Sequence, residues 1–125
     1  ADLRKANLIR ADLRDADLLE ANLLNADLTT AFCKGANFFM ADLRCANCTE
    51  INLQAADLQG ANLRQANFLK AQVQDAKLTG AEFHGAVVHS ADFLDSLGLT
   101  LGQTSEAEVD ARTRWPTYLR PETQL

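Results

Sequence analysis

The chain has 125 residues, of which 47% are hydrophobic and 23% charged, and its formal net charge is -5. This length is typical of a single domain that buries a core without disulfide or metal staples. No apolar run approaches the roughly 20 residues of a membrane-spanning helix, and the basic residues are scattered. The sequence therefore predicts no membrane contact and no direct nucleic-acid binding. Three cysteines are an odd count, which favours a reducing compartment over a secreted disulfide framework.

Residues 1–95 repeat with a period of five. Written in fives, the chain reads ADLRK, ANLIR, ADLRD and continues in phase to ADFLD at residues 91–95, which makes 19 units. The first position is alanine in 18 units, with Ile51 as the exception, the second is Asp or Asn in 14, and the third is Leu in eleven. In an extended segment the first and third side chains share one face and the second points the other way. This pattern predicts short extended sides joined by turns, in which Asp and Asn side chains bond to turn amides.

The tandem A(D/N)LXX motif resembles the pentapeptide-repeat family over 95 of the 125 residues. The resemblance implies an all-β solenoid, a right-handed quadrilateral parallel β-helix of about 19 units. Four units would form each coil, giving just under five coils, and a short C-terminal helical cap would follow. Residues 20 apart would stack in columns, so that third-position side chains form a ladder along the axis of each side. The fourth and fifth positions would face outward.

Residues 96–125 break the repeat, so we expect two parts: the β-helix at 1–95 and a C-terminal cap with a short helix and tail at 96–125. Ser105 and Glu108 form a capping-box pattern, which predicts a helix within residues 104–112. The apolar residues expected to cover the last coil are Leu97, Leu99, Leu101, Val109 and Trp115. A tail that binds a partner through Trp115, Tyr118 and Leu119 is the alternative.

The N-terminal coil has no corresponding cover. Ala1 stands inside the first unit, and Leu3 and Leu8 would leave apolar surface and open backbone at this end. We expect either that a natural cap has been removed or that a second copy stacks there to form a homodimer, because bare strand edges invite pairing.

Cys45 and Cys48 have the spacing of a redox motif, but the five-residue frame separates them. Cys48 is a third-position residue directed to the axis, whereas Cys45 is a fifth-position residue at an outer corner. Cys33 also occupies a third position, and buried thiols behave as small hydrophobic groups. We therefore interpret Cys33, Cys48 and Ile51 as one packing adjustment, in which Ile51 fills the space that the two cysteines leave. Cys45, beside Arg44, would be a lone surface thiol.

No set of residues has the arrangement of an active site. His84 and His89 would project from adjacent sides along different directions, and most carboxylates occupy the structural second position. There is no glycine-rich phosphate loop and no metal-ligand spacing. The sequence therefore predicts no catalytic, cofactor-binding or metal-binding residues, and a protein that is not an enzyme.

The outward positions provide the candidate contacts with a partner. Leu19 and Phe39 would stack on the fourth side, with Met40 and Leu24 near the adjoining corners, and Phe32 would point out from the third side. Adjacent exposed apolar residues often mark an interface. A competing surface is the first side, where Arg44, Arg64 and His84 would form a ladder. The alternative for that ladder is a solvated face balanced by Asp42, Asn62 and Glu82.

These observations predict a non-catalytic scaffold that presents a flat side to an unidentified protein partner. The family resemblance also implies an alternative, a DNA-mimic inhibitor of a type II topoisomerase such as gyrase. Nine basic residues stand against thirteen acidic ones in residues 1–95, which departs from that alternative. Because the family is abundant in cyanobacteria, we expect a bacterial cytoplasmic location, with the thylakoid lumen or periplasm as alternatives.

Overall fold

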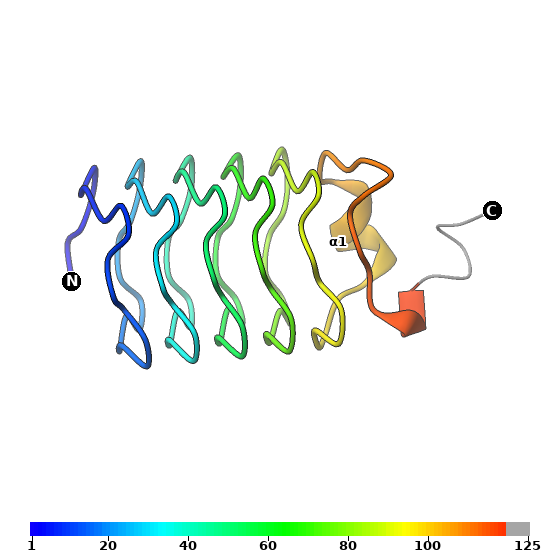
Figure 1. Cartoon of the computed structure of the whole chain (residues 1–125), viewed down its shortest axis with the longest axis horizontal. Helices are drawn as coiled ribbons and strands as arrows, with labels where there is room; N and C mark the ends of the chain where they lie inside the picture. The colour runs from blue at the N-terminus through cyan, green and yellow to red at the C-terminus, as the bar shows by residue number, and fades with distance from the viewer. Residues whose placement is uncertain (120–125) are drawn as a thin grey trace.

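The computed structural model describes residues 1–119, which form a rod of stacked coils (Figure 1). The N-terminus lies at one end of the rod, and helix α1, Leu101–Ser105, lies at the other. A short 3-10 helix, η1, spans Thr117–Leu119. Neither helix in this part of the chain is long and apolar enough to cross a membrane.

The coils are joined by single parallel β-bridges rather than by long strands. From Asp2↔Asn22 to Lys77↔Leu97, every bridge pairs second-position residues 20 apart, so four units make one coil with four sides. At each bridge a third-position amide donates to the next coil, as from Leu3 to the Asn22 carbonyl at 2.7 Å. The predicted register of stacked columns is confirmed. We number the sides from the N-terminus: the first begins at residue 1, the second at 6, the third at 11 and the fourth at 16.

Each corner is a tight turn with a left-handed residue. The fifth residue of all 19 units has a positive φ, although only four of these residues are glycine. The following alanine amide donates to the third-position carbonyl, as from Ala71 to Phe68 at 3.0 Å. A positive φ at the third residue of a turn is the hallmark of type II geometry. The residue types at these positions, such as Lys70 and Glu50, do not predict a left-handed turn from the sequence. The closed coil imposes this conformation on them.

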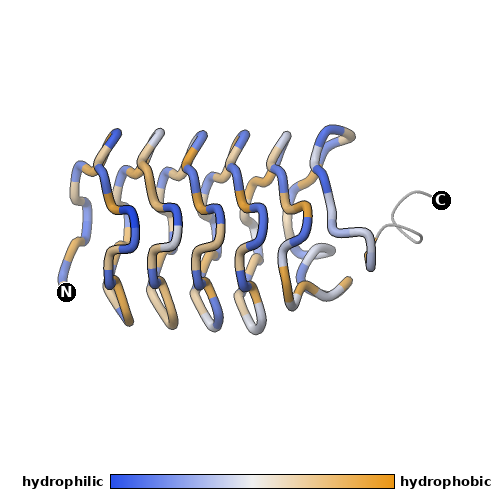
Figure 2. The backbone as a smooth tube through the Cα atoms, turned by 60° about the horizontal axis from the view of Figure 1, so that its bottom comes forward, coloured by the Kyte–Doolittle hydropathy of each residue, from blue (hydrophilic) through white to orange (hydrophobic). Residues whose placement is uncertain are grey.

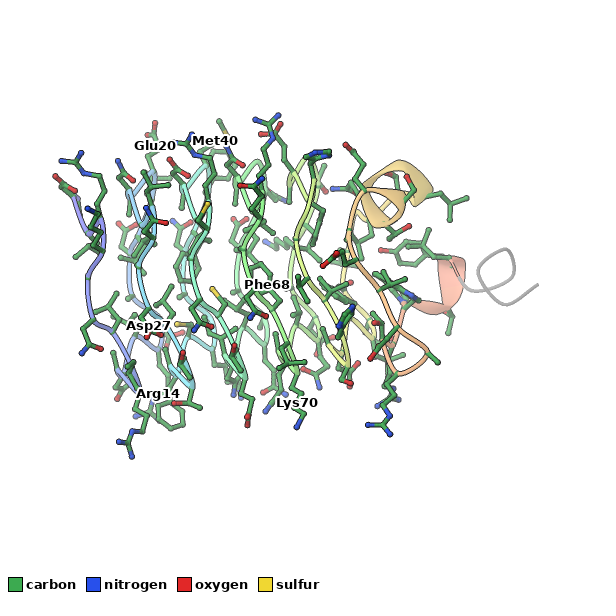
Figure 3. The ribbon with its side chains drawn as sticks, turned by 90° about the horizontal axis from the view of Figure 1, so that it is seen from above. Arg14, Glu20, Asp27, Met40, Phe68 and Lys70 are labelled. Carbon is green, nitrogen blue, oxygen red and sulfur yellow. The ribbon has the colours of Figure 1, made fainter. Side chains whose placement is uncertain are left out.

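The first and third positions fill the interior, as the repeat predicts. Alternation of apolar and polar residues is visible along every coil (Figure 2). Phe38, Leu43 and Val88 are almost completely buried, and Phe68 projects into the core (Figure 3). In the first coil, Leu3, Leu8 and Leu13 are only partly buried, since this coil has one neighbour rather than two.

The second-position side chains stabilise the turns, which confirms the expected role of Asp and Asn. Asn67 Oδ1 accepts the amide of Leu69 at 3.0 Å, and Asp92 Oδ1 accepts the amide of Leu94 at 3.0 Å. The same two-residue bond recurs along all four sides. Each one satisfies an amide at a corner that the bridges do not reach.

The predicted helix within residues 104–112 is wrong. Helix α1 ends at Ser105, and its capping box is formed by Thr100 and Gln103, not by Ser105 and Glu108. Glu108 instead pairs with Val87 in a parallel bridge, and its amide donates to the Ala86 carbonyl at 2.7 Å. This pairing satisfies backbone amides and carbonyls at the open edge of the last coil, which would lack hydrogen-bond partners if residues 104–112 formed a helix.

Two expected cap residues, Leu99 and Trp115, lie against the last coil, whereas three others are exposed. Leu99 is buried, and Trp115 is half-buried. The exposed residues are Leu97, Leu101 and Val109. Leu97 occupies a second position and therefore faces outward, and helix α1, which contains Leu101, buries none of its residues. Val109 follows Glu108 at the open end of the second side.

The C-terminal residues 115–119 are folded onto the rod rather than projecting as a partner-binding tail. The Tyr118 hydroxyl donates to the Ser96 carbonyl at 2.8 Å and accepts the amide of Leu99 at 3.2 Å. Leu119 is buried. The remainder of the predicted tail, residues 120–125, lies outside the described residues.

Candidate functional site

The fourth side of the rod carries a short column of exposed apolar side chains. Its fourth-position residues are Leu19, Phe39, Gln59 and Thr79, and Leu19 and Phe39 are 47% and 39% exposed. The amides of Leu19 and Phe39 are held by Asp17 Oδ1 and Asn37 Oδ1, at 3.1 and 2.9 Å. These bonds fix the backbone beneath both side chains, so the column is presented on a rigid support.

Met40 extends this column around the corner between the fourth and first sides. Its side chain is 53% exposed and shares a corner column with Glu20, one coil earlier, as Figure 3 shows. The next residue in that column is Gly60, and a side chain there would collide with the Met40 sulfur atom. The Met40 side chain thus lies over Gly60 along the corner. We call Leu19, Phe39 and Met40 the apolar patch.

The other predicted apolar contacts lie apart from the patch. Leu24 is half-buried on the first side. Phe32 is exposed on the third side, where it occupies a second position. Ile9 is a further exposed apolar residue, on the second side, that the sequence analysis did not single out. The fourth position of Ile9 in its unit could have predicted its exposure from the sequence. The residue stacked on it in the next coil, Thr29, is not apolar.

The net negative charge of the protein is concentrated along the fourth side, which also carries the apolar patch. One basic residue, Lys77, and six acidic residues lie on the fourth side and its two corners: Asp15, Asp17, Glu20, Asp57, Asp75 and Asp95. The remaining eleven acidic and eleven basic residues of the sequence cancel. None of the six acidic residues forms an ion pair with any part of the chain that the structure describes. We call this surface the acidic side. Sequence analysis missed it, although the 20-residue register would have shown it.

The first side carries the predicted ladder of Arg44, Arg64 and His84, and each of these side chains lies beside a carboxylate. Arg44 binds Asp42 at 2.7 Å, and Arg64 binds Glu82 at 2.6 Å. His84 Nδ1 lies 3.7 Å from Glu106 Oε2. The hydrogen bond to Asp42 raises the pKa of Arg44 above its usual range. This balance supports the alternative of a solvated face for the first side.

The three cysteines are free thiols in three different places. Cys33 and Cys48 are buried, whereas Cys45 is exposed and its thiol lies 3.6 Å from Gln65 Oε1. Burial raises the pKa of the Cys33 thiol to about 12 and that of Cys48 still further. The buried Ile51 donates its amide to the Cys48 carbonyl at 3.1 Å, and its carbonyl accepts the amide of Gln72 in the next coil at 2.9 Å. Within residues 1–119, no three His, Cys, Asp or Glu side chains are grouped to hold a metal ion.

The coils and their period define a class of protein built from one repeated unit. The family model for pentapeptide repeats matches eight copies, over residues 1–32, 31–68, 46–85 and 56–93. The chain therefore belongs to the pentapeptide-repeat family.

Several solved structures resemble this one. A pentapeptide repeat protein from the thylakoid lumen of Arabidopsis thaliana is 31% identical, with a TM-score of 0.80, over 88% of this chain and 79% of that one. HetL, from the cyanobacterium Nostoc sp. strain PCC 7120, is involved in heterocyst differentiation regulation. It is 25% identical, with a TM-score of 0.61, over 90% of this chain and 58% of its own. No curated protein sequence matches the chain. These similarities establish a solenoid β-helix.

Proposed function

We propose that this protein is a non-catalytic scaffold that contacts a protein partner through its apolar patch. The observation that carries the proposal is the adjacency of Leu19, Phe39 and Met40 on a side whose backbone is rigidly supported. Exposed apolar groups are common singly, but contiguous ones typically serve as contact sites. A solenoid suits this role, because its stacked units hold side chains at fixed spacings along a flat side.

The proposal is tested by capture of partners from an extract of the source organism with two tagged double variants. Leu19→Asp/Phe39→Asp introduces charge into the patch, and Ile9→Asp/Phe32→Asp introduces the same charge at exposed apolar sites on other sides. We expect the wild type and the second variant to retain the same protein, and the first variant to lose it. Circular dichroism checks that both variants fold. Equal retention by both would contradict the proposal, as would retention of nothing by the wild type.

A DNA-mimic inhibitor of a type II topoisomerase has less support. Imitation of DNA calls for acidic charge along both edges of a rod, as in a duplex with two phosphate strands. Here six of the eight acidic residues of 1–95 that form no ion pair lie on the fourth side and its corners, and the rest of residues 1–95 carries eight basic and seven acidic residues. We expect the protein to leave DNA supercoiling by gyrase unchanged, and inhibition in that assay would favour the alternative.

The first coil provides a second proposed contact, between two copies of the chain. Leu3, Leu8 and Leu13 are partly buried there, and the amides of Asn7 and Asp12 have no hydrogen-bond partner among residues 1–119. Two such coils stacked end to end would cover both surfaces. Analytical ultracentrifugation is expected to show a dimer at high protein concentration, and a monomer throughout would contradict it.

For the location we propose the bacterial cytoplasm, with the thylakoid lumen or periplasm as alternatives. The similar Arabidopsis protein comes from the thylakoid lumen, whereas HetL comes from a cyanobacterium. Cell fractionation with an antibody against the protein distinguishes these compartments.

A further inference from the structure

We infer that the acidic side binds a protein segment in which arginine side chains flank apolar ones. This inference rests on the proposed function and adds the chemistry of the partner. It depends on a comparison within the same rod, in which the first and third sides form an ion pair that the fourth side lacks.

On the first and third sides, three second-position aspartates bind an arginine two residues further along. In Asp42–Arg44, Nε donates to Oδ1 at 2.9 Å and Nη2 donates to Oδ2 at 2.7 Å. The same bidentate contact joins Asp2 to Arg4 and Asp12 to Arg14. The repeat therefore holds its aspartates in a geometry that accepts a planar guanidinium group.

The fourth side has the aspartates but not the arginines. Asp17 is followed two residues later by Leu19, and Asp57 by Gln59. In both aspartates Oδ1 accepts the turn amide, while Oδ2 has no hydrogen-bond partner in the described chain. Each carboxylate thus offers the oxygen that binds arginine elsewhere in the rod.

The two aspartates are placed on either side of the aromatic member of the apolar patch. Asn37, the second-position residue of the Phe39 unit, bridges to Asp17 in the preceding coil and to Asp57 in the following one. The two aspartates thus belong to one column, and along the rod Phe39 lies at the level between them, one coil from each. A bound segment could place an apolar side chain against Phe39. An arginine before and an arginine after that side chain would then bind the carboxylates of Asp17 and Asp57. Glu20, on the Met40 corner, extends the negative charge to the other edge of the patch.

Charge also decides between the possible occupants. The acidic side holds six acidic residues and one basic residue, Lys77, so two copies of this side would repel each other. Anionic lipid surfaces and nucleic acids would be repelled for the same reason. At physiological ionic strength the screening length is about 8 Å, so acidic residues on neighbouring coils act together on an approaching cation. A cationic apolar protein segment is the occupant that both the patch and its charge favour.

The test uses three fluorescein-labelled synthetic peptides of equal length and measures their binding to the whole protein by fluorescence anisotropy. One peptide alternates leucine and arginine, one replaces arginine by lysine, and one replaces leucine by serine. We expect the leucine–arginine peptide to bind most tightly and the serine–arginine peptide to bind weakly. Chemical-shift changes in a titration followed by NMR should be confined to the fourth side. Equal binding of all three, or shifts on another side, would overturn the inference.

The decisive protein variant is Asp17→Asn/Asp57→Asn, which removes both carboxylates. Asparagine is common at this position of the repeat and can still accept the turn amide, so the fold is retained. The matched control, Asp27→Asn/Glu50→Gln, removes the same charge from the second side and its corner. We expect the first variant to bind the leucine–arginine peptide about tenfold more weakly, as loss of a charge-assisted bidentate contact predicts, and the control to bind as the wild type does.

Equal weakening in both variants would overturn the inference, because general electrostatic attraction would then account for the binding. The scaffold proposal has a separate outcome. If capture of a natural partner depends on Leu19 and Phe39 but not on Asp17 and Asp57, the proposed function stands and the arginine inference falls. If capture depends on neither pair, the proposed function itself falls.

Discussion

The indole ring of Trp115 stacks on the phenyl ring of Phe93, with ring centroids 5.2 Å apart and an angle of 11° between the planes. Arg114, the residue before Trp115, bridges to Asp92, the residue before Phe93. Trp115 therefore occupies the third position of an additional partial coil and continues the axial ladder of the third side. The irregular C-terminal segment uses the same registry as the repeat to close the core.

Replacement of Trp115 by alanine should uncover Phe93 and destabilise the C-terminal end of the rod. For this half-buried side chain we expect a loss of about 3 kcal/mol in the free energy of unfolding, at the low end for large aromatic truncations. Urea unfolding followed by circular dichroism measures it. Trp115→Phe, which keeps a stacking ring, should lose clearly less. Equal losses in the two variants would show that the stacked ring does not stabilise the cap.

Cys48 and Ile51 provide a test of compensated packing. Both side chains are buried, and Ile51 stands where the repeat otherwise has alanine. Cys48→Leu should overpack the core and cost about 1–3 kcal/mol. Ile51→Ala should leave a cavity and cost about 2–5 kcal/mol. The double variant should be less destabilised than the sum of the two, because each change relieves the other. Simple additivity in chemical denaturation would contradict the compensation.

The left-handed corners predict an unusual effect of glycine. Lys70 is exposed at a fifth position with a φ of 58°, a conformation that costs non-glycine residues about 1–2 kcal/mol, against about 0.5–1 kcal/mol for the greater chain entropy that glycine loses on folding. Lys70→Gly should therefore stabilise the protein by about 0.5–1 kcal/mol. Lys34 is exposed at a fourth position and is not left-handed, so Lys34→Gly should destabilise it by about 0.5–1 kcal/mol. Thermal unfolding of both variants measures the difference, and the same sign for both would contradict this explanation.

Asp110 attaches the cap to the last regular coil through its side chain. In most units the fifth-position amide donates to a main-chain carbonyl of the next coil, as from Lys70 to His89, but the Ser90 amide donates to Asp110 Oδ1 at 2.9 Å. This bond, with others from Thr113 and Arg112, lowers the pKa of Asp110 to about 2. The lowered pKa means that the folded state favours the ionised carboxylate, so its stabilisation is present above the unfolded pKa of about 4.

That stabilisation should be lost as the pH falls from about 4 through 2. We expect Asp110→Ala to be less stable than the wild type at pH 7 and to approach it in stability near pH 2. Glu108→Ala, which removes a neighbouring exposed carboxylate, is the control and should show little change at either pH. Parallel pH profiles for the wild type and Asp110→Ala would contradict the role assigned to Asp110.

The error in the predicted C-terminal helix has a specific physical cause. Ser105 and Glu108 have the sequence of a capping box, but the open edge of the last coil offers Glu108 backbone partners at Ala86 and Val88. A capping box stabilises a helix start by about 1 kcal/mol, whereas unpaired buried amides and carbonyls each cost about 1–3 kcal/mol. Pairing with the last coil therefore outweighs the local capping pattern of Ser105 and Glu108. The short helix lies nearer the N-terminus of the cap, at Leu101–Ser105.

The period of five by itself predicted short extended sides, buried first and third positions and the separation of Cys45 from Cys48, because side chains alternate along an extended segment. The resemblance to the pentapeptide-repeat family supplied the four-sided coil and its 20-residue columns. The tertiary structure alone decided which outward carboxylates form an ion pair and which do not. Leu19, Phe39 and Met40 gather with unpaired carboxylates such as Asp17 and Asp57 only because stacked coils bring residues 20 apart into contact. Whether an aspartate binds an arginine or stays open to a partner depends on which side chain that stacking places beside it.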